Sequence, residues 1–334
     1  MTHHDIAGPC FEDFHPGLSF DAPAVTLTAG HAAAYQALFG DRLRLPLDHR
    51  AAGLALGGAV AHPLLAIHMA IGQSTWASQR VKANLFYRGL YLRRPVLLGD
   101  TIHTVTTVVG LRQNRKQTGR GATGLVALEM RTHNQRNEEV LHCWRCPMIP
   151  CRNDDHESGY QDDLEPLGRS DAATAAASLD AAAEHWTTVE ATSWRGRRAR
   201  DLAVADVLRI EARDTVTGAP ELVRMSLNMA MAHTDARLSY LGERLVYGGH
   251  VISIAHAQVT RALPNIIAML AWESCDHTAP TVENDRVRSE VTILDIRGQR
   301  SGSLVKLRVE SFAARGNPEV ETKVLDWVFW ALSA

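Results

Sequence analysis

Residues 93–110 read RRPVLLGDTIHTVTTVVG, and residues 277–294 read HTAPTVENDRVRSEVTIL. The second segment follows the first at an offset of 185 residues, which places Asp100 opposite Asp285. Two further pairs of similar segments occur in the same order along the chain: 60–70 with 246–257, and 137–149 with 317–332. This ordered repetition indicates that the chain consists of two diverged copies of one structural unit.

Each copy shows a helical pattern followed by strand patterns. In the second copy, Val251, Ile254 and Ala255 recur at helical spacing and form an apolar stripe. The segments after this stripe are rich in Val and alternate apolar with polar side chains, as strands do: 287–298, 304–314 and 319–332. This order predicts an α+β unit in which a curled antiparallel sheet wraps around one long helix. Two fused units of this kind make a double hotdog.

The segment between the copies has a different composition. Residues 151–185 are rich in Asp, Ser, Gly and Ala, which suits a surface connection with a short Ala-rich helix. We therefore expect an N-terminal hotdog at 1–150, a linker at 151–185 and a C-terminal hotdog at 186–334.

The charge balance argues against a nucleic-acid partner. The 334 residues carry a formal net charge of -2, and 46% are hydrophobic and 22% charged, as in an ordinary globular protein. Nucleic-acid-binding proteins usually carry a clustered basic excess. The short basic cluster WRGRRAR at 194–200 has two interpretations: a solvated connection ahead of a strand, or a contact with a phosphorylated ligand.

The N-terminus and the cysteines point to a reducing compartment. The opening MTHHDIAGPC is polar and no run of about 18 apolar residues occurs, so we expect a soluble cytoplasmic protein without a membrane partner. Five cysteines suit free thiols. Cys143, Cys146 and Cys151, with His142, look like metal ligands, but no second ligand pair is evident. We therefore expect apolar strand positions there and no metal.

Two adjacent glycines, Gly248 and Gly249, stand at the start of the predicted helix of the second copy. Inside a helix each glycine would cost about 1 kcal/mol relative to Ala. At a helix start, unpaired backbone N–H groups and the helix dipole can receive an anion, such as the oxyanion of a thioester enolate. The alternative is a turn that requires positive φ angles.

His233 lies fifteen residues before Gly248. Its ordinary pKa near neutrality makes histidine a suitable general base for activating water. A lone histidine near an apolar stretch is often only structural. A base together with an oxyanion-binding helix start favours catalysis over the two separate structural explanations.

These residues resemble the MaoC-like hydratase family. SLNMAMAHTD at 226–235 matches the family motif at His233, LVYGGHVIS at 245–253 matches the start of the family's central helix, and FEDFHPG at 11–17 looks like the usual opening. Three further segments are similar to the mesaconyl-CoA hydratase (β-methylmalyl-CoA dehydratase) subgroup: 28–42, 86–101 and 326–332. The resemblance covers most of the chain. It implies reversible hydration of an α,β-unsaturated CoA thioester, most specifically mesaconyl-CoA to β-methylmalyl-CoA, without a metal or redox cofactor.

The resemblance also implies roles for individual residues. His233 would take a proton from water, and the backbone N–H of Gly248, helped by Gly249, would hold the enolate. Asn228 stands where most family members have Asp, and a carboxamide cannot accept that proton. We hypothesise that Asn228 orients the water without repelling a carboxylate of the substrate. Tyr247 is expected to hydrogen-bond the substrate or the water.

A substrate with a second carboxylate should meet a cation. Arg244, just before the glycine pair, and Arg237 are the candidates, and the alternative for each is a surface or packing role.

The first copy has the appearance of a degenerate site. Gly40-Asp41 keeps the start of the motif, but Pro46 stands five residues after Asp41, where the family has His. At the helix start, His62 is followed by Pro63, which lacks the N–H that Gly248 supplies. We expect this copy to form a wall of the acyl-CoA tunnel.

Other functions remain as alternatives. The chain could be a general (R)-specific enoyl-CoA hydratase, or a non-catalytic acyl-CoA-binding protein, which the missing Asp favours. Hotdog thioesterases generally carry a carboxylate near the glycine position, where this chain has His250 and Ser253. The fused copies should form an internal pseudo-dimer, and a sheet edge could still support a homodimer.

Overall fold

The structure is a computed structural model that describes the 334 residues apart from 1, 5, 117–118, 192–193, 300–301 and 317. Asn317, where the last of the matched segments begins, lies outside the described residues.

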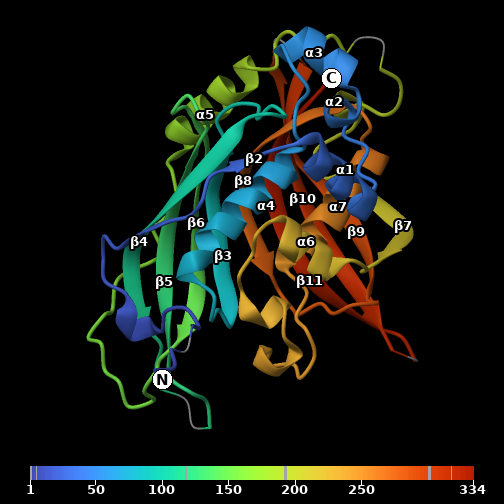
Figure 1. Cartoon of the computed structure of the whole chain (residues 1–334). Coiled ribbons are helices and arrows are strands. Elements are labelled where there is room, and N and C mark those ends of the chain that lie inside the picture. The colour runs from blue at the N-terminus through green and yellow to red at the C-terminus, as the bar shows by residue number, and fades with distance from the viewer. Residues whose placement is uncertain (1, 5, 117–118, 192–193, 300–301, 317) are drawn as a thin grey trace.

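The described strands form one antiparallel sheet. Its order is β1-β4-β5-β6-β3-β8-β11-β10-β9-β7, and β2 pairs with β4 (Figure 1). The strands are β1 Ser19–Asp21, β2 Val25–Thr26, β3 Ala83–Leu92, β4 Thr101–Gln113, β5 Thr123–His133, β6 Glu139–Pro150, β7 Val207–Thr215, β8 Ile266–His277, β9 Arg286–Gln299, β10 Gly302–Arg315 and β11 Val320–Ser333.

Two central helices, α4 and α7, pack against this sheet, and the other helices lie around them (Figure 1). The α-helices are α1 Ala29–Phe39, α2 Arg44–Leu47, α3 His49–Leu56, α4 Pro63–Ser74, α5 Ala172–Glu184, α6 Ala219–Met225 and α7 Gly248–Ala262. The 3-10 helices are η1 Phe11–Asp13, η2 Thr75–Ala77, η3 Ala199–Asp201, η4 Met231–His233 and η5 Ala236–Leu238. Among the described residues, no helix combines the length and apolar character needed to span a membrane.

The offset of 185 residues recurs in the three-dimensional structure. It relates the first residue of α4 to that of α7, and the first residue of β4 to that of β9. It also relates single hydrogen bonds: the Leu97 N–H donates to Asp100 Oδ2 at 2.9 Å, and the Val282 N–H donates to Asp285 Oδ2 at 3.0 Å. The predicted α+β double hotdog is confirmed.

The two copies meet at a seam between β3 and β8. These strands pair antiparallel, with Tyr87 opposite Cys275 and Leu90 opposite Trp272, and these two pairs are each other's counterparts at the offset of 185 residues. The central helices also touch, because His68 Nε2 of α4 lies 2.8 Å from Ser253 Oγ of α7. As a result, residues of β3 in the first copy border the N-terminal end of α7 in the second copy.

The connecting segment contains the expected Ala-rich helix, α5. Its N-cap residue Asp171 accepts hydrogen bonds from the Ala173 and Thr174 N–H groups, which stabilises the helix start. The helix also contributes to packing, because Leu179 and Ala182 are buried in a core cluster with Leu270 of β8. The boundaries 1–150, 151–185 and 186–334 stay a prediction.

The cysteines are free, as expected. Cys143 and Cys146 are buried in two different core clusters, so their thiols do not converge on one point. Burial raises the pKa of both thiols to about 12, which keeps them protonated at neutral pH.

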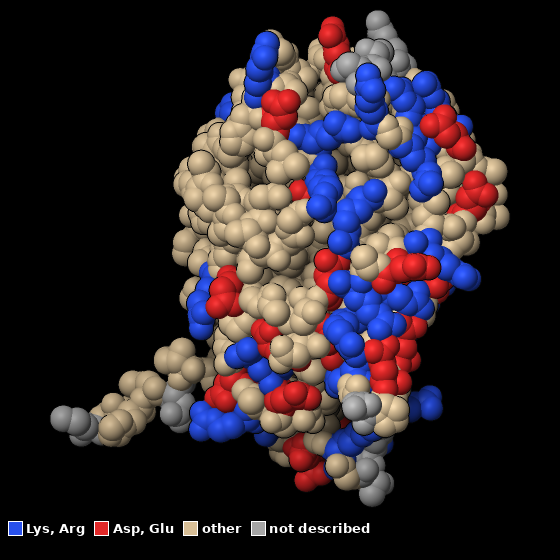
Figure 2. Space-filling view, turned by 90° about the vertical axis from the view of Figure 1, so that its right-hand side faces the viewer, with Lys and Arg blue, Asp and Glu red and all other residues tan. Residues whose placement is uncertain are grey.

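Charged side chains of both signs are mixed on the face shown in Figure 2. On the outer strands of the second copy they form ion pairs, among them Arg288 with Glu321 at 2.6 Å and Arg308 with Asp326 at 2.5 Å. Within the basic cluster at 194–200, Trp194 stacks under the Arg44 guanidinium at 5.0 Å. This contact shows that Trp194, at one end of the cluster, is packed against the first copy. Whether the cluster contacts a phosphorylated ligand stays a prediction.

Candidate functional site

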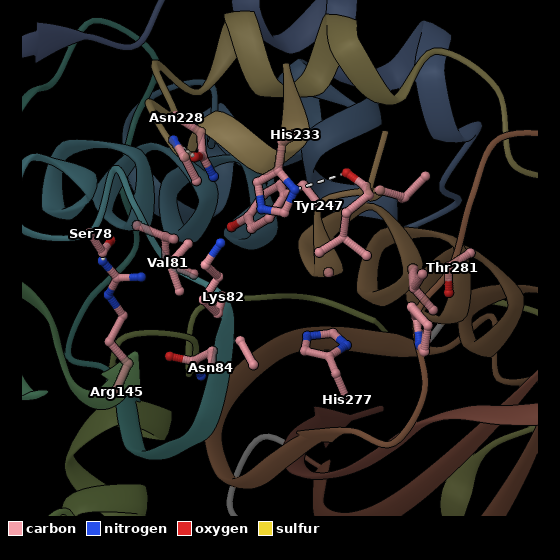
Figure 3. Close-up of a pocket in the computed structure, with 18 of the residues that line it drawn as sticks. Ser78, Val81, Lys82, Asn84, Arg145, Asn228, His233, Tyr247, His277 and Thr281 are labelled. Carbon is pink, nitrogen blue, oxygen red and sulfur yellow. Dashed lines mark hydrogen bonds between the residues drawn. The ribbon is translucent and has the colours of Figure 1, made fainter. Parts of the chain in front are cut away.

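A cavity of about 240 Å³ opens at the N-terminal end of α7, between the two copies (Figure 3). The second copy contributes Asn228, His233, Tyr247, Gly248 and His277 to its lining, among others. The first copy contributes residues of α4, η2, β3 and β6 and of the segment between η2 and β3, among them Thr75, Ser78, Lys82, Asn84, Tyr87 and Arg145. Four of the seven residues predicted from the sequence therefore meet in one cavity.

His233 is held in the protonation state that a general base requires. Its Nδ1 lies 2.9 Å from the Leu245 carbonyl oxygen (Figure 3), and because a carbonyl can only accept, Nδ1 carries the proton. The Nε2 atom is therefore the unprotonated nitrogen, free to accept a proton. Burial lowers the pKa of His233 to about 4, so the ring is neutral at physiological pH.

Asn228 reaches the cavity from a strained loop. Leu227 before it adopts a left-handed backbone with φ of 59°, which is unusual for a large side chain. The Asn228 Oδ1 atom accepts a hydrogen bond from the Ala230 N–H at 2.9 Å. This leaves the Nδ2 amide group as the donor available to a water molecule or a ligand.

The N–H groups of Gly248 and Gly249, the first two of α7, have no acceptor among the described residues. Tyr247, its N-cap residue, makes no side-chain capping hydrogen bond, and neither Gly248 nor Gly249 has a positive φ. The turn explanation for the glycine pair is therefore wrong. A Cβ atom on Gly248 would lie only 2.3 Å from His277 Nε2, and one on Gly249 would lie 2.5 Å from the Tyr247 ring. Close packing therefore demands glycine at both positions.

His277, which the sequence analysis did not single out, is the neighbour of Gly248. Its Nε2 atom is buried and has no hydrogen-bond partner among the described residues. Burial, together with the nearby His233, lowers the pKa of His277 to about 4. The sequence did contain a hint, because His277 is the first residue of the repeated segment 277–294. Its counterpart in the first copy is Leu92, which has no catalytic group, so the comparison of the copies did not point to a function for His277.

Arg145 and Lys82 are the cations of the cavity, and they were also missed. Arg145 is buried, with 3% of its surface exposed, whereas Lys82 is exposed. Arg145 lies between Cys143 and Cys146 in the segment at 137–149, where only the cysteines and His142 were considered as candidate ligands.

The other sequence candidates lie outside the cavity lining. Arg237 is on the surface and pairs with Asp235 at 2.8 Å, and Arg244 faces Glu283 at 3.4 Å. Gly249 packs against the Tyr247 and His68 rings instead of lining the cavity. Tyr247 itself does line it, with its hydroxyl 3.4 Å from His68 Nδ1.

The thioesterase alternative lacks its carboxylate. No Asp or Glu occurs among the described residues that line the cavity. His250 packs edge-on against Phe39, and Ser253 bonds to His68, so neither faces the cavity.

A wider groove of about 1020 Å³ adjoins the cavity and shares Lys82, Ala83 and Tyr240 with it. It is basic, because Arg115, Lys116 and Arg120 also line it.

A second, much smaller cavity of about 20 Å³ occupies the equivalent place in the first copy. Its lining follows that of the larger cavity with apolar replacements. Pro46 occurs where the second copy has His233, Pro63 where it has Gly248, and Leu92 where it has His277.

Asp41 and Asn228 occupy equivalent positions. Each accepts a hydrogen bond at 2.9 Å from the N–H two residues later, and each is followed by a residue whose N–H donates to an equivalent threonine, Thr260 or Thr75. Asp41, however, is turned away from its cavity. It accepts from His256 Nδ1 at 2.6 Å and lies 3.3 Å from His62 Nε2.

Comparisons with known proteins agree with this geometry. The chain is 30% identical over 344 residues to the mesaconyl-CoA hydratase of Cereibacter sphaeroides, covering 98% of both chains. It is 30% identical over 335 residues to the β-methylmalyl-CoA dehydratase of Chloroflexus aurantiacus, covering 95% of this chain and 91% of that protein. No protein-family profile matches the chain.

Solved structures show the same architecture. A Mycobacterium tuberculosis protein described as having a double hotdog fold, and as essential for survival during infection, is 44% identical with a TM-score of 0.89, covering 99% of this chain and 100% of that one. A Chloroflexus aurantiacus protein described as a MaoC domain dehydratase is 25% identical with a TM-score of 0.79, covering 99% of each.

Proposed function

The chain belongs to the MaoC-like hydratase and dehydratase family, and we propose that it adds water reversibly to the double bond of an α,β-unsaturated CoA thioester. The observation that carries this proposal is the placement of an unprotonated His233 Nε2 and the unpaired N–H of Gly248 on the same cavity.

The residues divide the chemistry between them. A water molecule donates one hydrogen bond to His233 Nε2 and accepts one from the Asn228 amide. His233 takes the proton as hydroxide adds to the β-carbon, and the electron pair of the double bond moves to the thioester oxygen. The Gly248 N–H, at the positive end of the α7 dipole, stabilises that oxyanion. His233 then returns the proton to the α-carbon, which completes the addition of one water.

His277 adds a second interaction at the oxyanion. Because its Nε2 atom lies against Gly248 and has no partner among the described residues, we assign a proton on that nitrogen as the second donor to the thioester oxygen. A neutral imidazole is a suitable donor for this purpose.

For the specific substrate, we propose mesaconyl-CoA, with β-methylmalyl-CoA as the product. The relatives from Cereibacter sphaeroides and Chloroflexus aurantiacus carry these activities in their names. The basic groove next to the cavity supports a CoA thioester, because Lys82, Arg115 and Arg120 are suited to its phosphates. The alternatives are a general enoyl-CoA hydratase and a non-catalytic acyl-CoA-binding protein.

The test follows the ultraviolet absorbance of the conjugated thioester when purified protein is mixed with mesaconyl-CoA or crotonyl-CoA. We expect rapid loss with mesaconyl-CoA, and a decrease in rate of about 10²–10⁴-fold in His233→Ala. Loss with crotonyl-CoA alone would assign a general hydratase. No loss with either thioester, while both bind, would assign the non-catalytic role.

A further inference from the structure

We propose that Arg145 binds a carboxylate on the acyl group of the substrate, and that it thereby selects dicarboxylic over monocarboxylic CoA thioesters. This inference rests on the proposed function for the identity of the thioester. The position, the missing counterion and the equivalent residue in the other copy each support it.

Arg145 extends from β6 into the cavity that contains Asn228 and His233. In Figure 3 it lies beside Ser78, on the same side of the view as Asn228 and away from Thr281. Its Nη2 atom donates to the Ser74 carbonyl at 3.1 Å and to the Ser78 hydroxyl at 2.5 Å. These contacts fix the guanidinium at the end of α4.

The charge of Arg145 has no counterion. Among the described residues, no carboxylate lies within 4.0 Å of its guanidinium, and its Nε atom is buried without an acceptor. A buried charge is costly unless it is paired and hydrogen-bonded. By contrast, the guanidinium of Arg315 forms a two-pronged pair with the buried carboxylate of Asp285. An unpaired guanidinium beside an open cavity therefore suits an anion that arrives with the ligand.

The fold does not require a charge at this position. Arg145 pairs with Tyr87 across β6 and β3, and the residue that pairs with the equivalent Trp272 is Phe329. Phe329 is buried and stacks on Trp327 with ring centres 4.1 Å apart. The same strand position is thus cationic in the first copy, where its side chain lines the open cavity, and apolar in the second copy.

The geometry also matches the substrate. The thioester oxygen belongs at Gly248 and the β-carbon at His233, so a carboxylate on the β-carbon extends further along the acyl chain. In Figure 3, His233 and Tyr247 lie between Arg145 and Thr281 across the view, and we place the substrate carboxylate on the Arg145 side. The planar guanidinium can then bind both carboxylate oxygens.

The experiment compares mesaconyl-CoA with tiglyl-CoA, which has a methyl group in place of the β-carboxylate. In Arg145→Met we expect kcat/KM for mesaconyl-CoA to fall about 100-fold or more, while kcat/KM for tiglyl-CoA stays level or rises. Arg145→Lys should recover part of the activity on mesaconyl-CoA. An equal fall for both thioesters, or no change for either, would overturn the proposal.

A binding measurement separates this proposal from the proposed function. Methylsuccinyl-CoA and 2-methylbutyryl-CoA are the saturated forms of the two thioesters and cannot be hydrated. Calorimetry on wild type and Arg145→Met should show that only methylsuccinyl-CoA loses affinity. That result would uphold the carboxylate site even if the wild type hydrates neither unsaturated thioester. Equal affinities of the wild type for the two saturated thioesters would refute the site.

Discussion

The cavities of the two copies have the same place in the fold and opposite chemistry. The second copy opens about 240 Å³ beside His233, Gly248 and His277, whereas the first leaves about 20 Å³ beside Pro46, Pro63 and Leu92. Both central helices begin at the same point, but the start of α4 is satisfied internally, because His62 Nδ1 accepts from the Leu64 N–H. On the proposed function, the helix start that receives the ligand is the one without a side-chain cap.

Asp41 in the first copy and its equivalent Asn228 in the second differ in the same way. Burial acts to raise the pKa of Asp41, but His256 and His62 outweigh it and hold that pKa well below its usual range. In the cavity that contains Asn228, Ile71 of the first copy and Tyr247 of the second take the places of His256 and His62 at the offset of 185 residues. A carboxylate at position 228 would lack the two histidines that hold Asp41, which gives a second reason for Asn228 besides the repulsion of a substrate carboxylate.

The largest effect is expected from giving the second helix start the residue of the first. Gly248→Pro removes the backbone donor, so we expect kcat for the hydration to fall about 10²–10³-fold. Gly248→Ala keeps the N–H but displaces His277, so it measures the steric part alone. Pro63→Gly should leave kcat unchanged, and a comparable fall in that variant would show a general defect of folding.

Asp41→Asn should affect stability and not turnover. It removes the carboxylate from a buried hydrogen-bonded group, so we expect a loss of about 3 kcal/mol in the free energy of unfolding at pH 7. Because the folded pKa of Asp41 is depressed, its stabilisation is complete above the unfolded pKa near 4 and disappears as the pH falls through the folded pKa. Urea unfolding at several pH values tests this. A difference that stays constant down to pH 2 would contradict it.

Asn228→Asp tests the other half of the comparison. We expect about 10-fold weaker activity on mesaconyl-CoA, with activity on crotonyl-CoA kept or improved. Without a cation partner, burial should raise the pKa of the new carboxyl, so the variant should lose stability, by about 1–3 kcal/mol, as the pH rises through that value. Kinetics with both thioesters and unfolding at pH 5 and pH 8 measure these effects. Better turnover of mesaconyl-CoA would contradict the explanation.

The smallest effect concerns the backbone before this residue. Leu227 in the second copy and Gly40 in the first both have left-handed φ angles, of 59° and 56°. Leu227→Gly should therefore relieve strain and raise the free energy of unfolding by up to about 1 kcal/mol. Gly40→Ala should lower it by a similar amount. Thermal unfolding of the pair decides this, and a loss of stability in Leu227→Gly would mean that packing of Leu227 outweighs the strain.

The fold could be predicted from the sequence because the repeat and the periodic patterns can be recognised in short stretches of the chain. The segments at 93–110 and 277–294 placed the copies in register, and the Ala-rich stretch predicted α5. Asn228, His233, Tyr247 and Gly248 were candidates for the same reason, because they lie close together in the sequence, whereas His277 of the same copy lies further along the chain and was missed.

The remaining half depends on contacts between distant segments. The alternation of apolar and polar residues along 137–149 indicates which side chains share one face of the strand with Arg145. It does not indicate that β3 pairs with β8, which is what places β6 close to α7. Arg237 and Arg244 were chosen because they are close to the glycines in sequence, yet acidic neighbours bind both. Proximity along the chain was a poor guide to the cation, because the sheet brings it from the other copy.

The seam between β3 and β8 also bears on how such a site can diverge. In an assembly of two identical single-copy chains, every substitution appears in both cavities, so a change that improves one entrance alters the other as well. Covalent fusion removes that symmetry. One copy could then acquire the cation of Arg145 on a strand whose twin position, Phe329, kept its apolar packing. The duplicated gene thus allows one surface to specialise in recognition while its twin preserves the integrity of the sheet.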